Sequence, residues 1–210
     1  MMRARARMTA AFVALGVVAA CTGARAAPPG PRDPDWPCQQ IKVTQLSVAT
    51  VWAGPPLDQA QAHWRDDPEV AALVAKLAQR RVSLEQARAE IAGFATAAGE
   101  RRRDRLLALF AGLFASLDEE RSAVVNGLDR YGLRQKALAD KVRGEADALH
   151  AEQAAATPDE ARLATLGNQV GWDTRVFEDR RTSIRYACDV PNIIEQRLFA
   201  LSQTIQAALQ

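Results

Sequence analysis

The chain has 210 residues, with 27 Lys and Arg, 25 Asp and Glu and a formal net charge of +2. Four of the basic residues but none of the acidic ones lie in the first 26 residues, so the net charge of the other 184 residues is −2. This balance argues against nucleic acid as a partner, because nucleic-acid-binding domains carry a basic face. After the first 26 residues, no apolar run approaches the roughly 20 residues that a bilayer-spanning helix needs.

The N-terminal segment has the order of a secretory signal peptide. Arginines precede an apolar run over residues 8–20, and Ala24-Arg25-Ala26 offers a small-residue cleavage site. We expect residues 1–26 to be removed and the mature protein to work in the periplasm, where disulfides persist. The segment Val18-Ala19-Ala20-Cys21 also fits a lipobox, in which Cys21 would be lipidated and would anchor the protein to the envelope. The sequence leaves both routes open.

Either route leaves one pair of cysteines, Cys38 and Cys188. In an oxidising compartment we expect them to form a structural disulfide that fastens the N-terminal segment to the last third of the chain. Closing a loop of roughly 150 residues is worth about 5 kcal/mol in the chain-entropy treatment, as an upper figure. A redox-active pair is the alternative. Catalytic dithiols usually lie close together in the sequence, however, and no C-x-x-C motif is present.

We interpret residues 27–58 as an extended N-terminal arm. Its first part, residues 27–37, holds too many prolines for a helix or a central strand. Its second part has spaced apolar residues but no evident partner strand, so we expect an irregular segment that lies on a helical body. The arm contains Trp36 and Trp52, which either pack it against that body or form an aromatic platform for a ligand. Packing is the commoner use of such residues.

The chain then predicts three short helices, over residues 59–65, 68–80 and 84–95. Their caps are Asp58, then Asp67 followed by Pro68 in the first turn, then Ser83 with Gln86 in a capping box. We place a turn at residues 96–99, because Gly99 interrupts the helical pattern.

A long antiparallel hairpin fills the rest of the chain. Residues 100–155 carry apolar residues at a spacing of four and three, which is typical of a coiled-coil seam. The apolar face is wide over residues 106–117 and narrow beyond Tyr131, as expected for a helix with several neighbours at one end and one neighbour at the other. We therefore expect a bundle at the base and a two-helix projection beyond it.

The return helix has a clear start signal. Thr157-Pro158-Asp159-Glu160 combines a cap, a first-turn proline and a capping-box acid, which places the hairpin tip near residues 154–158. Val190-Pro191 is expected to bend or break the return helix, because proline lacks an N–H donor and restricts the residue before it.

Groups that could carry chemistry are scarce. His63 and His150 are the only histidines, and Asp147 with His150 is at most a faint likeness to the metal motifs of helical bundles. We find no nucleophile elbow, phosphate-binding loop, zinc spacing or dinucleotide fingerprint. The sequence therefore predicts no metal site, no cofactor and no enzymatic activity.

One basic cluster stands out before the long helix. It consists of Arg101, Arg102, Arg103 and Arg105 and is interleaved with Glu100 and Asp104. We expect these two acids to compensate the arginines on the helix surface, since positive charge opposes the dipole at a helix start. Contact with an anion or an anionic lipid is the alternative.

Two short blocks of the chain stand out. The first block is residues 35–40 (Asp-Trp-Pro-Cys-Gln-Gln) with residues 52–55, and the second is residues 186–191 (Tyr-Ala-Cys-Asp-Val-Pro) leading into residues 194–199. These blocks resemble those of a group of exported helical proteins of proteobacteria for which no function is established. The resemblance implies no activity. It does imply that both cysteines lie in the recognisable blocks, which is consistent with a bond between them.

Taken together, these features predict an all-α protein with a small helical bundle, a long antiparallel coiled-coil-like hairpin and an irregular N-terminal arm. The expected parts are a signal peptide (1–26), the arm (27–58) and a single helical domain (59–210).

We expect an exported, non-enzymatic adaptor or scaffold of the bacterial envelope, whose partner is an envelope protein or a second copy. Contact with the membrane is expected only through an N-terminal lipid. The alternative function is a periplasmic small-ligand or cofactor-binding module, with a pocket between the Trp36–Trp52 arm and the base helices.

Overall fold

The computed structural model describes residues 33–210. The predicted signal peptide and Cys21 lie outside these residues. The described part is all-α, as predicted, and contains no strand. Its elements in chain order are α1 (Val48–Val51), α2 (Asp58–His63), the 3-10 turn η1 (Trp64–Asp66), α3 (Pro68–Leu77), α4 (Leu84–Ala97), the 3-10 turn η2 (Gly99–Arg101), α5 (Arg102–Gln153) and α6 (Glu160–Leu209).

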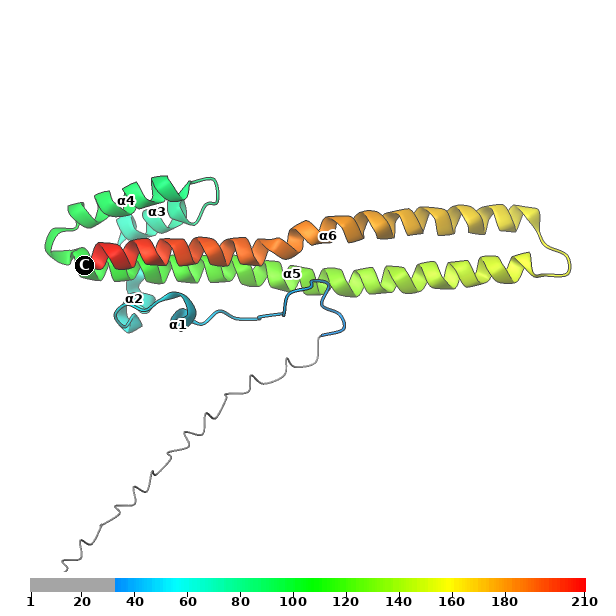
Figure 1. The fold of residues 1–210 in the computed structure, drawn as a ribbon, viewed down its shortest axis with the longest axis horizontal. Helices are drawn as coiled ribbons and strands as arrows, with labels where there is room; N and C mark the ends of the chain where they lie inside the picture. The colour runs from blue at the N-terminus through cyan, green and yellow to red at the C-terminus, as the bar shows by residue number, and fades with distance from the viewer. Residues whose placement is uncertain (1–32) are drawn as a thin grey trace, which may run out of the picture. The chain divides into compact units, whose positions relative to one another are not determined.

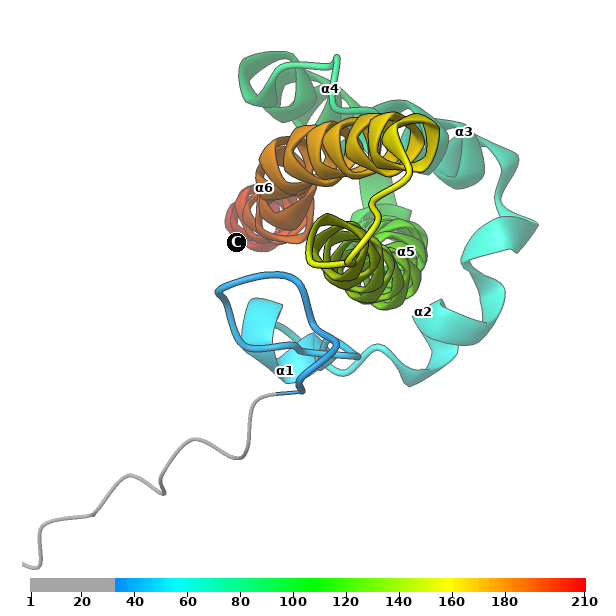
Figure 2. The ribbon, with the colours of Figure 1, turned by 90° about the vertical axis from the view of Figure 1, so that its right-hand side faces the viewer.

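The dominant feature is the antiparallel hairpin of α5 and α6. The two helices have 52 and 50 residues, so each is about 75–80 Å long at 1.5 Å per residue. Figure 1 shows α1 to α4 gathered along one end of the hairpin, while the other half consists of α5 and α6 alone among the described elements. Viewed from the hairpin tip, α3 and α4 lie on one side of the pair and the arm with α1 lies on the other (Figure 2).

Burial along α6 follows a seven-residue repeat over nearly its whole length. The buried or partly buried residues of one row are Leu163, Val170, Phe177, Ile184, Pro191, Leu198 and Ile205. A helix keeps such a strict repeat in contact with its neighbour only by supercoiling around it. Residues of α6 that are seven positions apart therefore lie on the same side of the helix relative to α5.

The core lies at the base of the hairpin. Phe110 of α5 is fully buried and stacks on Trp52 of the arm, with ring centroids 4.0 Å apart. The cluster around them also takes in Leu77 of α3, Ile91 of α4 and Leu198 of α6. The arm thus contributes an aromatic ring to the same core as the helices.

Two of the three predicted short-helix caps are present. The carboxylate of Asp67 accepts hydrogen bonds from the backbone N–H groups of Glu69 and Val70, at 3.0 and 3.2 Å. Ser83 and Gln86 form the reciprocal capping box. The first prediction was wrong: Asp58 lies inside α2, whose N-cap position is Leu57 and has no side-chain cap. Asp58 therefore contributes its charge to the first turn but caps nothing.

Helix α3 ends at Leu77, earlier than predicted, and a side chain from α6 bonds the carbonyl of this last residue. The buried guanidinium of Arg197 donates two hydrogen bonds to the carbonyl of Leu77, at 3.0 and 2.6 Å, and one to that of Val82, at 2.9 Å. Cations are favoured at helix C-termini for this reason. The position of Arg197 is not visible from the sequence around residue 77.

The expected partners of the basic cluster were wrong for Arg105. Its side chain is buried and bonds Asp67 at 2.9 Å and Glu69 at 2.5 Å, both at the start of α3. Two arginines of the hairpin thus hold the two ends of α3, Arg105 through acids at the N-terminus and Arg197 through carbonyls at the C-terminus.

The N-cap of the return helix lies two residues later than predicted. Asp159, not Thr157, is the N-cap, and its carboxylate accepts from the backbone N–H groups of Ala161 and Arg162. Glu152, at the end of α5, in turn accepts from the backbone N–H of Asp159. The carboxylate of Asp159 is a stronger hydrogen-bond acceptor than the hydroxyl of Thr157. Asp159 is therefore the N-cap, and Pro158 stays outside the helix.

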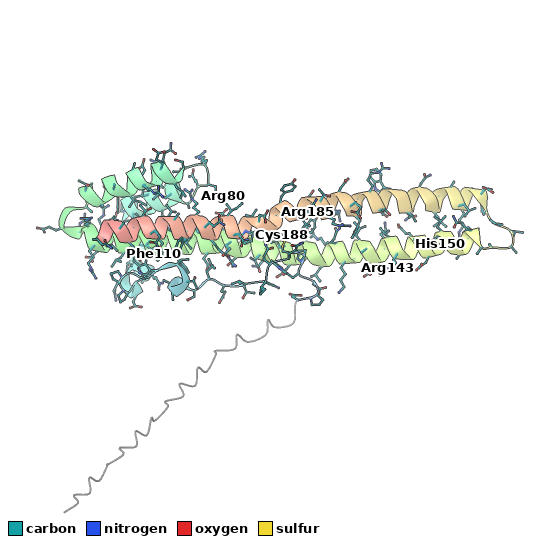
Figure 3. The ribbon with its side chains drawn as sticks, in the orientation of Figure 1. Arg80, Phe110, Arg143, His150, Arg185 and Cys188 are labelled. Carbon is teal, nitrogen blue, oxygen red and sulfur yellow. A yellow bond between two sulfur atoms is a disulfide. The ribbon has the colours of Figure 1, made fainter. Side chains whose placement is uncertain are left out.

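Helix α6 continues through Pro191 without a break. Pro191 is buried in the row that faces α5, so packing holds the helix together although one backbone hydrogen bond is missing. Figure 1 shows the axis of α6 shifted sideways in the orange part of the ribbon, and Figure 3 places Arg185 and Cys188 at that shift. The helix is bent there.

Candidate functional site: the disulfide junction of the arm and the hairpin

A disulfide joins Cys38 of the arm to Cys188 of α6, as predicted, with Cα atoms 5.6 Å apart. It lies next to a small apolar cluster of Leu128, Ile184 and the ring of Trp36. The bond therefore fixes the arm to the hairpin at the place where the two long helices leave the base.

Polar contacts extend this attachment on both sides of the bridge. Gln40 donates a hydrogen bond to the carbonyl of Cys188. Lys42 forms ion pairs with Asp33 at 3.0 Å and with Asp129 of α5 at 2.8 Å. The hydrogen bonds that Lys42 donates to Asp129 and Asp33 raise its pKa, so its positive charge is stabilised at the contact.

The arm crosses α5 at Gly132. A Cβ atom at this position would lie 2.0 Å from the carbonyl oxygen of Asp35 and 3.1 Å from the ring of Pro37. The close contact therefore requires glycine. We did not single out Gly132 from the sequence, although a glycine inside a helical pattern is a known sign of close backbone approach.

An open groove of about 560 Å³ borders the disulfide. The arm lines it with residues 37–40, which include Cys38, and α6 lines it with residues between Glu178 and Asp189. The side chains of Arg181 and Glu178, 3.3 Å apart, form an ion pair on its wall. The groove thus has amide, carboxylate and guanidinium groups and carries both charges.

The two tryptophans of the arm serve different clusters. Trp36 donates its ring N–H to the carbonyl of Gln40, at 2.8 Å, and packs beside the disulfide. Trp52 is 8 % exposed, donates to the carbonyl of Pro55 at 2.8 Å and stacks on Phe110 in the base. The structure brings them to separate places rather than to one aromatic platform, so both rings pack the arm against the hairpin.

The histidines lie on exposed surfaces of separate elements. His63 pairs with Asp66 at 2.9 Å, and His150 lies 3.3 Å from the amide oxygen of Gln153. Figure 3 shows His150 near the end of the projecting half, far along α5 from Phe110. Within residues 33–210 no group of three or more His, Cys, Asp or Glu side chains is placed to hold a metal ion.

The projecting half of the hairpin has a partly polar seam. Lys141 of α5 bonds Asp173 of α6 at 2.5 Å and Glu145 at 3.3 Å. Gln169 donates to Glu145 at 2.7 Å. The hydrogen bond from Lys141 lowers the pKa of Asp173, and the same bond raises the pKa of Lys141. Such a layer selects one register of the two helices, because any slip would leave these half-buried charges without partners.

Comparison with protein-family models, with curated proteins and with solved structures finds no match. Over residues 33–210 no helix combines the length and apolarity that crossing a bilayer requires.

Proposed function

We propose that this protein is an exported, non-enzymatic adaptor or scaffold of the bacterial envelope that presents its helical hairpin to another envelope protein. The observation that carries this proposal is the shape of residues 33–210. Half of the α5–α6 hairpin extends beyond the other described elements (Figure 1), while the disulfide fastens the arm at its root. A narrow helical projection offers reach and a long contact surface but encloses no pocket.

We further propose that the protein works in the periplasm. The signal-like order of residues 1–26 supports export, and a bond between Cys38 and Cys188 is compatible with an oxidising compartment. Release after Ala26 is the route we favour, and lipidation of Cys21 is the alternative. The mass of the purified mature protein separates them, because a lipidated form starts at Cys21 and carries the acyl groups. On the sequence blocks around Cys38 and Cys188, we place the protein with the exported proteobacterial group that it resembles.

The adaptor proposal is tested by shortening the hairpin. Residues 140–172 are deleted, and Ala139 is rejoined to Asp173 by a short glycine-rich turn; Lys141 and Asp173 are ion-paired, so these two ends lie level across the seam. After crosslinking in cells, the full-length protein should retain a specific envelope protein that the shortened one loses. Retention of the same protein by the shortened form contradicts the proposal, provided that circular dichroism shows its base to be folded.

The groove beside the disulfide supports a second candidate function, a small-ligand-binding module. A polar groove of this size accommodates a metabolite-sized molecule. This function predicts a saturable change in tryptophan fluorescence on titration with a metabolite, since Trp36 packs beside the bridge. It also predicts that shortening the hairpin has no effect on binding, which separates the two functions.

A further inference from the structure

The seven-residue repeat of α6 assigns one of its flanks to the arm. Three residues spaced by seven connect α6 to the arm: Cys188 through the disulfide, Ser202 directly and Glu195 through Arg121 of α5. Glu195 lies 2.5 Å from the buried Arg121, which also donates to the carbonyl of Val43, and Ser202 donates to the carbonyl of Val51. This flank is occupied from the hairpin root to the base.

Within residues 33–210, the opposite flank is occupied only in the base. Arg197 reaches from it to the carbonyls of Leu77 and Val82, so the turn between α3 and α4 lies there. Val190, seven residues before Arg197, is partly buried against the base core. Figure 1 shows no described element over α6 from this turn towards the hairpin tip.

Beyond the turn, this same flank carries an apolar stripe that is exposed. Trp172, Tyr186 and Ile193 are 64 %, 76 % and 46 % exposed, and their spacing is fourteen and then seven residues. Val176 and Val190, both partly buried, lie four residues after the two aromatic residues. The stripe therefore repeats the four-and-three spacing of a coiled-coil seam on a side of α6 that does not face α5.

We propose that this stripe, Trp172 to Ile193, binds one amphipathic α-helix of an envelope partner, which packs along α6 as the third helix of a coiled coil. The proposal rests on the adaptor function and names its contact surface. Because α6 is already supercoiled around α5, the stripe stays in line along α6, and a third helix wound with the same supercoil would meet its four-and-three spacing over the whole length. Continuity supports the same occupant, because the bound helix would extend the side of α6 on which the α3–α4 turn already packs.

The α3–α4 turn also limits which partner can bind along the stripe. A second copy that paired its stripe antiparallel, with Trp172 level with Ile193 of the other chain, would place its residues 160–168 level with residues 197–205. At Arg197 that part of the flank is already covered by the α3–α4 turn. Since α6 of the second copy is continuous through residues 160–168, it would collide with this turn. A separate helix of about 20 residues, roughly 30 Å long, fits between the turn and Trp172.

The interruption of the stripe indicates the chemistry of the partner helix. Asp179 and Ser183, both exposed, occupy the two seam positions between Val176 and Tyr186. The carboxylate of Asp179 has no ion-pair partner within residues 33–210, and a carboxylate at such a position favours Lys or Arg opposite it. We expect a partner helix with apolar residues at four-and-three spacing and one basic residue near its middle.

The test uses a fluorescein-labelled synthetic helix of three heptads, with Leu at both seam positions and one central Lys, added to the full-length mature protein. Anisotropy should show saturable one-to-one binding that weakens at least tenfold in the double variant Tyr186→Ser, Ile193→Ser. The matched control is Phe199→Ser, because Phe199 is equally exposed on α6 (50 %) but lies off the stripe; it should bind as the wild type does. All these side chains are exposed, so thermal melting should show unchanged folding.

Three results would overturn the proposal: equal binding by the double variant, equal weakening by Phe199→Ser, or a dimer in sedimentation that Tyr186→Ser dissolves. The cellular crosslinking assay tests this contact apart from the projecting half, because the shortened hairpin lacks Trp172 but keeps Tyr186 and Ile193. If the shortened hairpin keeps the partner and the double variant loses it, the stripe is the contact surface and the projecting half is not needed for binding. If the shortened hairpin loses the partner and the double variant keeps it, the stripe is not the contact surface and the adaptor function stands. If both keep it, both proposals are wrong.

Discussion

At Gly132 the backbone of the arm lies directly against α5, and the space left for a side chain is smaller than a methyl group. The carbonyl of Asp35 occupies the position that a Cβ atom would need. Backbone cannot give way as a flexible side chain does, so any other residue must displace the arm next to its disulfide. The absence of a Cβ atom at residue 132 therefore allows the arm to pack against α5.

We expect Gly132→Ala to destabilise the protein by about 1–3 kcal/mol, the usual cost of overpacking. Hydrogen exchange over residues 33–46 should accelerate, because the arm is lifted while the helices persist. The matched control is Gly144→Ala in the projecting part of α5, where nothing lies within 4 Å of the added Cβ; it should stabilise by up to about 1 kcal/mol. Equal effects at both positions would show that the arm does not rest on Gly132.

Arg197 is the second residue whose role depends on its surroundings. Burial lowers the pKa of its guanidinium, and its hydrogen-bond partners are backbone carbonyls, with two bonds to Leu77 and one to Val82. We expect Arg197→Met to lower the free energy of unfolding by about 2–4 kcal/mol, since two buried carbonyls lose their donors. Urea denaturation measures this change. Arg143→Met, at an exposed ion pair on the hairpin, should change it by less than about 0.5 kcal/mol.

At the scale of elements, α3 is held by charges at both ends. Its N-cap, Asp67, is also the partner of the buried Arg105. Burial raises the pKa of Asp67, but hydrogen bonds from Arg105 and from the backbone of Val70 and Glu69 outweigh it, so the pKa lies below its usual value. The acid form of Asp67 therefore loses both the cap and the ion pair.

This arrangement predicts a pH dependence. A carboxyl group whose pKa is lower in the folded state stabilises the protein above its unfolded pKa, near 4, and this contribution is lost as the pH falls through the folded value. Unfolding free energies measured by urea between pH 6 and 2.5 should fall with pH in the wild type. Asp67→Asn should be less stable at pH 6 and should show a smaller fall; an unchanged slope would mean that other carboxylates govern the acid response.

At the scale of the whole molecule, the disulfide connects an arm and a hairpin that each have further contacts. Trp52 anchors the arm in the base core, and the α5–α6 seam continues well beyond the bridge. The bridge therefore positions the segment around Trp36 more than it holds the helices together. Its loss should loosen the junction first.

We expect the double variant Cys38→Ser, Cys188→Ser to melt at a lower temperature, with a loss of up to about 5 kcal/mol in the chain-entropy treatment. Its helix content by circular dichroism should stay unchanged at 25 °C, while hydrogen exchange over residues 33–46 increases. Thiol titration of the denatured, unreduced wild type should find no free group in the mature form that starts at Ala27. Two free groups there would contradict the bridge.

The sequence by itself determined the all-α class, the cysteine pair, the caps at Asp67 and Ser83 and the coiled-coil character of the hairpin. Each of these depends on a local rule: a cap acts within three residues, and a seam repeats every seven. The cysteines could be paired because the predicted signal peptide, or lipidation, accounts for Cys21 and leaves two thiols with a single choice of partner.

Only the tertiary structure decided the rest. The carbonyl of Leu77 at the end of α3 takes its donor from Arg197, 120 positions away, and Arg105 takes its acids from α3 rather than from its own helix start. The same holds for the contact of the arm at Gly132 and for the flank of α6 that stays exposed. These features arise from segments that meet in space, and no local pattern specifies which side of a helix a distant segment will cover.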